Sequence, residues 1–182
     1  FTFPATACAP FNAVFRNTST AGQQFFWDFG DGSTSTQTNP THVYPSPGTY
    51  LVQLIAVDPN TCNKRDTITK NVTVVNKPTA SYTYSPNPTM ANMPIQLVNT
   101  SSGAVSYKWI FGDGKTLTTA KRDSVISYQY QKTGTYNVCL IAFNAAGCSD
   151  TTCTQISISV EVGYSVPNAF SPNGDGVNDK VF

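Results

Sequence analysis

The stretch Phe25-Phe26-Trp27-Asp28-Phe29-Gly30-Asp31-Gly32 decides how this chain is organised. It begins with an alternating aromatic strand pattern and ends in a tight turn. In a strand, this alternation places Trp27 and Phe29 on the same face. The two glycines give the turn conformational freedom around a carboxylate that can accept neighbouring N–H groups. We therefore expect a core β-strand that ends directly at this turn.

The same pattern returns once, as Tyr107-Lys108-Trp109-Ile110-Phe111-Gly112-Asp113-Gly114. Each copy is followed by a second pair of anchors. These are His42-Val43-Tyr44 before Gly48–Leu54, and Tyr128-Gln129-Tyr130 before Gly134–Leu140. A match of two separate blocks in the same order indicates a tandem repeat.

The repeat predicts two all-β domains, residues 1–76 and 77–161, followed by a C-terminal segment over residues 162–182. The boundary Asn76-Lys77-Pro78 is short, and Pro78 restricts its backbone. We therefore expect two β-sandwiches arranged end to end with limited bending. Since the chain begins at Phe1, we also expect a fragment of a longer protein.

The composition favours a protein of short strands and excludes some partners. Charged residues make up 12% of the chain and the net charge is +1, so no basic stripe is available for a nucleic acid backbone. With 12 Gly and 12 Pro, the chain has the turn residues that join short strands. The sequence contains no apolar run long enough to cross a membrane.

At Trp27–Gly32, His42–Tyr44 and Gly48–Leu54 the sequence resembles the PKD domain, an immunoglobulin-like β-sandwich found on cell surfaces. The second copy departs from the pattern at Ile110 and Tyr128, where the first copy has an aspartate and a histidine. The resemblance implies an all-β fold of two tandem sandwiches. The strand pattern assigns six aromatic residues to the structural core: Trp27, Phe29, Tyr50, Trp109, Phe111 and Tyr136.

The five cysteines favour disulfides over a metal site, because they form no C-x-x-C pair. We expect Cys8 to pair with Cys62, its only partner in the first domain. Cys139 and Cys153 face each other on adjacent antiparallel strands, at disulfide distance. Cys148 is predicted to be unpaired, with pairing to Cys139 or Cys153 as the alternative. Buried reduced thiols are the competing interpretation, whereas disulfides imply a location outside the cytoplasm.

The sequence offers no catalytic residue. Asp31 and Asp113 lie in different domains, so we interpret them as turn carboxylates that accept local N–H groups. His42 has no serine or cysteine partner and is interpreted as a packed residue. Trp27 and Trp109 are assigned to the core and not to sugar stacking. No cofactor is expected, with calcium as the one candidate.

The tail Val166-Pro167-Asn168-Ala169-Phe170-Ser171-Pro172-Asn173-Gly174-Asp175-Gly176-Val177-Asn178-Asp179 resembles the start of the C-terminal domain of Bacteroidetes gliding-motility and type IX secretion proteins. The resemblance covers residues 166–182. It implies export by the type IX system and a place at the cell surface, as in SprB-like adhesins. The implied partner is a PorP/SprF-like outer-membrane protein.

Two kinds of modification or ligand are suggested in addition. Oxygen donors on the glycine-rich tail suit Ca²⁺ but are also ordinary turn residues: Asn173, Asp175, Asn178 and Asp179. Resemblance to the Bacteroidetes O-glycosylation motif makes candidates of Thr67, Ser124 and Thr151. A bacterial origin argues against N-glycans at the three Asn-x-Ser/Thr sites, Asn17, Asn71 and Asn99.

Three functions follow from these observations. The first is a non-catalytic stalk of a large secreted adhesin, used in gliding or surface attachment. The second is an accessory region of a secreted polysaccharidase or protease. The third is a carbohydrate-binding module, which requires a planar row of exposed aromatic residues that the sequence does not present.

Overall fold

The computed structural model describes residues 1–60, 62–120 and 125–160, and every regular element in these ranges is a β-strand. No helix able to span a membrane occurs there. In chain order the strands are β1 (Thr6–Cys8), β2 (Phe11–Val14), β3 (Gln24–Asp28), β4 (Thr34–Ser35), β5 (Thr41–Tyr44), β6 (Gly48–Val57), β7 (Arg65–Val75), β8 (Tyr82–Ser85), β9 (Thr89–Met90), β10 (Pro94–Asn99), β11 (Ser106–Ile110), β12 (Thr116–Thr119), β13 (Val125–Gln129), β14 (Gly134–Phe143) and β15 (Ser149–Ser159).

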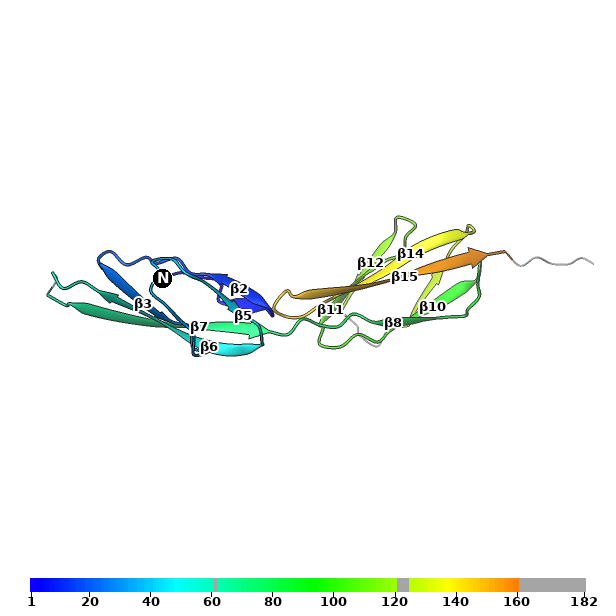
Figure 1. Cartoon of the computed structure of the whole chain (residues 1–182). Coiled ribbons are helices and arrows are strands. Elements are labelled where there is room, and N and C mark those ends of the chain that lie inside the picture. The colour runs from blue at the N-terminus through cyan, green and yellow to red at the C-terminus, as the bar shows by residue number, and fades with distance from the viewer. Residues whose placement is uncertain (61, 121–124, 161–182) are drawn as a thin grey trace, which may run out of the picture.

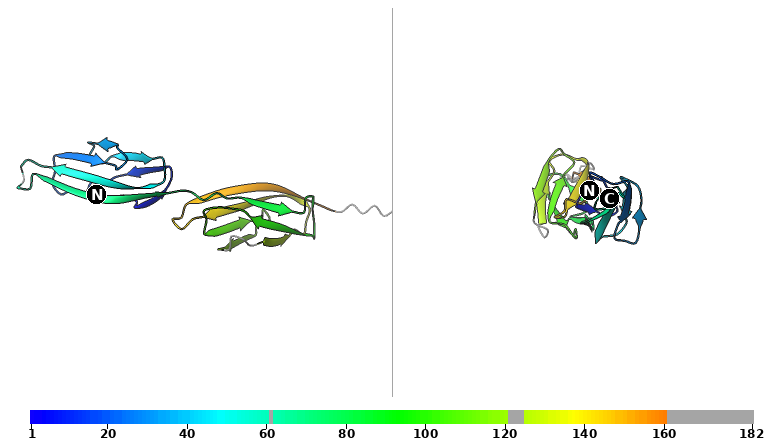
Figure 2. Two further views of the ribbon diagram at one scale, coloured as in Figure 1. Left: turned by 90° about the horizontal axis from the view of Figure 1, so that it is seen from below. Right: turned by 90° about the vertical axis from the view of Figure 1, so that its left-hand side faces the viewer.

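Each half of the chain forms its own β-sandwich. The first has a sheet of order β1-β7-β6-β3-β4 facing the pair β2-β5. The second has a sheet of order β12-β11-β14-β15-β9 facing β13-β10-β8. Figure 1 and the left view of Figure 2 show the two sandwiches end to end, which makes the described part of the chain elongated. The all-β fold expected from the sequence is confirmed.

The first core is built on the alternation of β3. Trp27 and Phe29 are almost fully buried, and they pack with Val52 and Leu54 of β6. Tyr50, at the start of β6, is partly buried against the same cluster. Burial of such large side chains is the main stabilising contribution to a domain of this size.

The second core repeats this arrangement. Trp109 and Phe111 are buried with Val138 and Leu140 of β14, and Tyr136 is partly buried beside them. The residues that follow Phe111 form a further strand, β12, which pairs antiparallel with β11 and extends that sheet by one strand.

Both turns after the tryptophan strands require glycine at their first position. Gly30 has φ +80°, and a Cβ atom there would lie 2.8 Å from the backbone nitrogen of Leu51. Gly112 has φ +81°, with the backbone nitrogen of Asn137 at the same 2.8 Å. Any side chain would therefore strain the backbone and push the neighbouring strand away.

Candidate functional site

The turn carboxylate of the first domain contacts a histidine ring. Asp31 Oδ2 lies 2.7 Å from His42 Nε2, and the His42 ring stacks on Phe29 with centroids 4.3 Å apart. Burial on its own raises the pKa of Asp31, but hydrogen bonds from His42 and Ser33 outweigh it, and the pKa is lowered. The carboxylate is therefore held charged in a structural turn.

The second domain has the same arrangement with tyrosine in place of histidine. The Tyr128 hydroxyl donates to Asp113 Oδ2 at 2.6 Å, and its ring stacks on Phe111 at 3.8 Å. Burial raises the pKa of Asp113, and the Tyr128 hydroxyl and the Lys115 N–H lower it to below its usual value. In both domains the ring that contacts the turn carboxylate stacks on the phenylalanine before the turn, so the pair has a packing role.

A disulfide joins the two domains. Cys8 is bonded to Cys148, with Cα atoms 5.7 Å apart and a sequence separation of 140. Strand β1 runs parallel to β7 and pairs Cys8 with Val75, which brings this cysteine to the linker. Cys148 is buried at the end of the turn between β14 and β15.

This bond corrects two sequence predictions. Cys8 does not pair with Cys62, and Cys148 is not unpaired. The physical reason is that β1 places Cys8 beside the linker, at the contact with the second domain, and not beside the turn that carries Cys62. Cys62 instead lies exposed in the turn between β6 and β7, with a free thiol.

The second disulfide is the one that the sequence predicted. Cys139 on β14 and Cys153 on β15 are directly opposed in the antiparallel pair, with Cα atoms 4.1 Å apart. This bond lies within the second domain and connects two adjacent strands of its larger sheet.

The linker is hydrogen-bonded to the turn that carries Cys148. Asn144 Nδ2 donates to the carbonyl of Asn76 at 2.8 Å. The Oδ1 atom of the same side chain accepts the backbone N–H groups of Ala146 and Cys148. Asn144 therefore orders its own turn and holds the end of the first domain.

The rest of the linker lies along the second domain as an extended segment. Thr79 exchanges two backbone hydrogen bonds with Ser102, and Ala80 N–H donates to Asp150 Oδ2 at 2.8 Å. The backbone N–H and carbonyl of Ser81 are both hydrogen-bonded to the Ser101 hydroxyl. With these bonds and the Cys8–Cys148 disulfide, the junction is fixed at several points and is not a free hinge.

The remaining predicted residues fall into two groups. Thr67 on β7 and Thr151 on β15 are exposed on strands. Ser124 and the proposed calcium ligands lie outside the described residues: Asn173, Asp175, Asn178 and Asp179. The described ranges contain no cluster of three His, Cys, Asp or Glu that could hold a metal ion.

Sequence reasoning missed the polar half of the junction. Asn144 and Asp150 contact the linker, but each is an ordinary turn or strand residue in the sequence. The one signal available was cysteine parity, since the second domain keeps Cys148 without a partner of its own if Cys139 and Cys153 pair.

Sequence comparison finds one family in both halves of the chain. Models of the PKD domain match residues 3–74 and residues 79–157. Both sandwiches are PKD domains. Such domains are non-catalytic modules, and the chain is made of them over these residues.

The curated relatives that match this chain over short stretches include collagenases. Collagenase ColA of Bacillus cereus is 45% identical over 60 residues, which is 33% of this chain and 6% of that protein. A microbial collagenase of Vibrio alginolyticus is 69% identical over 32 residues, which is 18% of this chain and 4% of that protein. The chain therefore spans only a small part of the length of these relatives.

One solved structure shows a similar fold over both PKD domains, and another is similar to a single domain. The fibronectin(III)-like modules of Clostridium thermocellum CbhA superpose with a TM-score of 0.50 at 17% identity, covering 87% of this chain and 93% of that one. The PKD1 domain of the Vibrio cholerae metalloprotease PrtV is 31% identical, with a TM-score of 0.39, and covers 46% of this chain and 99% of that one.

Proposed function

We propose that this chain is a non-catalytic stalk region of a large secreted cell-surface adhesin. The observation that carries the proposal is the junction, where the Cys8–Cys148 disulfide and the bonded linker hold two PKD domains end to end. Two sandwiches fixed in line are suited to separate a binding domain from the cell surface. An unstructured linker of the same length would not keep such a separation.

The export route and the cell-surface location are part of the same proposal. The tail resembles the C-terminal domain of type IX-secreted gliding-motility proteins, so the partner would be that machinery or a PorP/SprF-like outer-membrane protein. Disulfides support a location outside the cytoplasm. Immunolabelling of intact cells, with and without a working type IX system, tests this part. Surface signal that persists without the system would overturn it.

The spacer role is tested by exchanging the two domains within the full-length protein. Residues 1–160 are replaced by two unrelated immunoglobulin-like domains joined by a short linker, and a second variant lacks these residues entirely. We expect the exchanged protein to keep cell attachment and the shortened protein to lose part of it. If the exchanged protein is displayed at wild-type level but does not support attachment, the PKD domains bind something themselves and the proposal is wrong.

A second candidate is an accessory region of a secreted polysaccharidase or protease, favoured by the matches to collagenases. In that case, deletion of residues 1–160 would lower the hydrolysis of an insoluble substrate by the full-length protein and leave a soluble substrate unaffected. The absence of any hydrolytic activity in the full-length protein would exclude this candidate and favour the stalk.

A further inference from the structure

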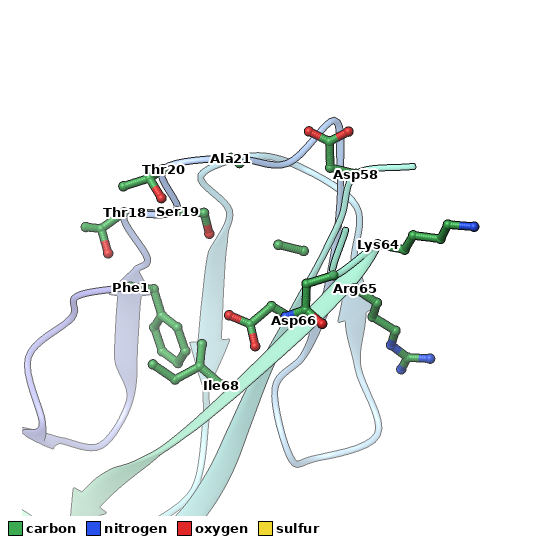
Figure 3. Close-up of a pocket in the computed structure, with 12 residues that line it drawn as sticks. Phe1, Thr18, Ser19, Thr20, Ala21, Asp58, Lys64, Arg65, Asp66 and Ile68 are labelled. Atoms are coloured by element: carbon green, nitrogen blue, oxygen red, sulfur yellow. The ribbon is translucent and has the colours of Figure 1, made fainter. Parts of the chain in front are cut away.

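A pocket of about 450 Å³ lies at the β6–β7 hairpin, at the end of the first domain remote from the junction in Figure 1, and Figure 3 shows its lining. Phe1 forms one side of it, the loop after β2 a second, and the β6–β7 hairpin a third. The loop contributes Ser19, and the hairpin contributes Asp58, Lys64 and Asp66.

The internal repeat shows what fills the corresponding place in the second domain. Phe1 contacts Trp27 edge to face with ring centroids 5.0 Å apart, and Tyr82 contacts Trp109 in the same way at 5.0 Å. Phe1 therefore occupies the position of Tyr82. The residues before Tyr82 are the interdomain linker.

The loop that lines the pocket in the first domain corresponds to the loop that binds the linker in the second domain. In the first domain Ser19 N–H donates to Asn17 Oδ1 at 2.9 Å, and in the second Ser101 N–H donates to Asn99 Oδ1 at 3.0 Å. The two loops thus have the same local structure.

The hairpin wall is equivalent as well. Asp66 pairs across the first hairpin with Ala56, and Asp150 pairs across the second with Ala142. In the second domain the equivalent hairpin binds the linker, because Ala80 N–H donates to Asp150. Thr79 and Ser81 contact the loop there.

Cys62 lies in the same hairpin turn, two residues before Lys64, which closes this turn as Cys148 closes the second. It follows Leu54 by eight residues, as Cys148 follows Leu140. The first turn is two residues longer than the second. It is closed by a hydrogen bond from Asp58 N–H to the Lys64 carbonyl, and the second by one from Asn144 N–H to the Cys148 carbonyl. The Cys62 thiol is exposed in this longer turn, and the next residue, Asn63, lines the pocket.

We infer that the pocket receives the linker strand of a further PKD domain, and that Cys62 forms a disulfide with the cysteine of that domain corresponding to Cys8. Asp66 accepts a backbone N–H of the incoming strand, as Asp150 accepts that of Ala80. Forming this bond removes two protons and two electrons from the two thiols. The oxidant is the disulfide of a thiol oxidoreductase, which accepts them and is reduced to a dithiol. The result is a series of PKD domains bonded at every junction.

The inference does not depend on adhesion or on the export route, so it can be tested separately from the proposed function. The full-length protein is isolated from its native cell, alkylated without reductant and mapped by peptide mass spectrometry. We expect the Cys62 peptide to be linked to a cysteine in the first strand of another PKD domain. The Cys8–Cys148 bond is the internal control for oxidation.

Three results would overturn the inference, provided that Cys8–Cys148 is formed in the same sample. They are an alkylated Cys62, a bond between Cys62 residues of two copies, and a bond to a small thiol. Each would mean that no PKD domain is docked at this end through Cys62.

A fusion tests the pocket itself. A second copy of residues 1–81, with its own Cys62→Ser change, is placed directly before Phe1 of the full chain. We expect the added Cys8 to pair with the original Cys62, and Asp66→Ala to slow this pairing at least several-fold. Asp150→Ala is the matched control, since it should slow only Cys8–Cys148 formation. Equal rates with and without Asp66 would show that the pocket does not bind the strand.

Discussion

Cys8, on the first strand of one PKD domain, is bonded to Cys148, the residue that closes the β14–β15 turn of the next. The bond connects the end of one sandwich to the beginning of the other, beside a linker that is itself hydrogen-bonded to the second domain. The pair of domains is therefore one elongated unit, and several consequences can be measured.

The Cys139–Cys153 disulfide stabilises the second domain. It closes a loop across 14 positions of sequence, and loss of such a constraint costs about 3 kcal/mol. We expect the Cys139→Ser/Cys153→Ser double variant to lower the free energy of unfolding of the second domain by roughly this amount, measured by urea denaturation. Cys62→Ser is the control and should change stability by less than about 0.5 kcal/mol.

Gly112 should not tolerate a side chain. Gly112→Ala combines a left-handed backbone with a Cβ atom 2.8 Å from Asn137 N, so we expect a loss of roughly 3 kcal/mol. Gly114 has φ +91° but open space around it, and Gly114→Ala should cost only about 1 kcal/mol. Thermal unfolding of both variants measures the difference. Equal effects would show that the contact with Asn137 does not matter.

The buried hydroxyl of Tyr130 holds the end of the tryptophan strand. It donates to the carbonyl of Phe111 at 2.6 Å, and Tyr130→Phe leaves that buried carbonyl without a partner. We expect a loss of about 1.5 kcal/mol in the free energy of unfolding. Tyr136→Phe is the matched control, because its hydroxyl bonds to Lys132 in an exposed position. A neutral Tyr130→Phe variant would contradict the assigned role.

The ionised Asp113 side chain should stabilise the second domain at neutral pH, and this stabilisation should be lost in acid. Its pKa is lower in the folded state than its ordinary value of 3.8, so its contribution is complete above that value. The contribution is lost as the pH falls through the lowered pKa. Urea denaturation between pH 7 and pH 2 should show a difference between wild type and Asp113→Asn that shrinks at the acid end. A difference independent of pH would contradict this.

The sequence predicted the parts of the fold that depend on periodicity. Alternation around Trp27 and Trp109 identified the core strands, because a strand buried on one face repeats every second residue. The register of β14 and β15 follows from the turn between them, and this placed Cys139 opposite Cys153.

The junction could not be predicted in the same way. Pairing of Cys8 with Cys148 depends on how two folded domains meet, and neither strand periodicity nor turn chemistry carries that information. The search for a partner of Cys8 was confined to its own domain, where Cys62 was the only choice. Asn144 and Asp150 were missed for the same reason, because their partners belong to the linker.

The distance between the two domains in solution tests the account most directly. Spin labels on non-natural residues at the exposed positions Leu51 and Val105 allow pulsed electron paramagnetic resonance without altering any cysteine. We predict one narrow distance distribution for the oxidised chain and a clearly broader one for the Cys8→Ser/Cys148→Ser variant. A broad distribution in the oxidised chain, equal to that of the variant, would show that the junction is flexible and would contradict the stalk.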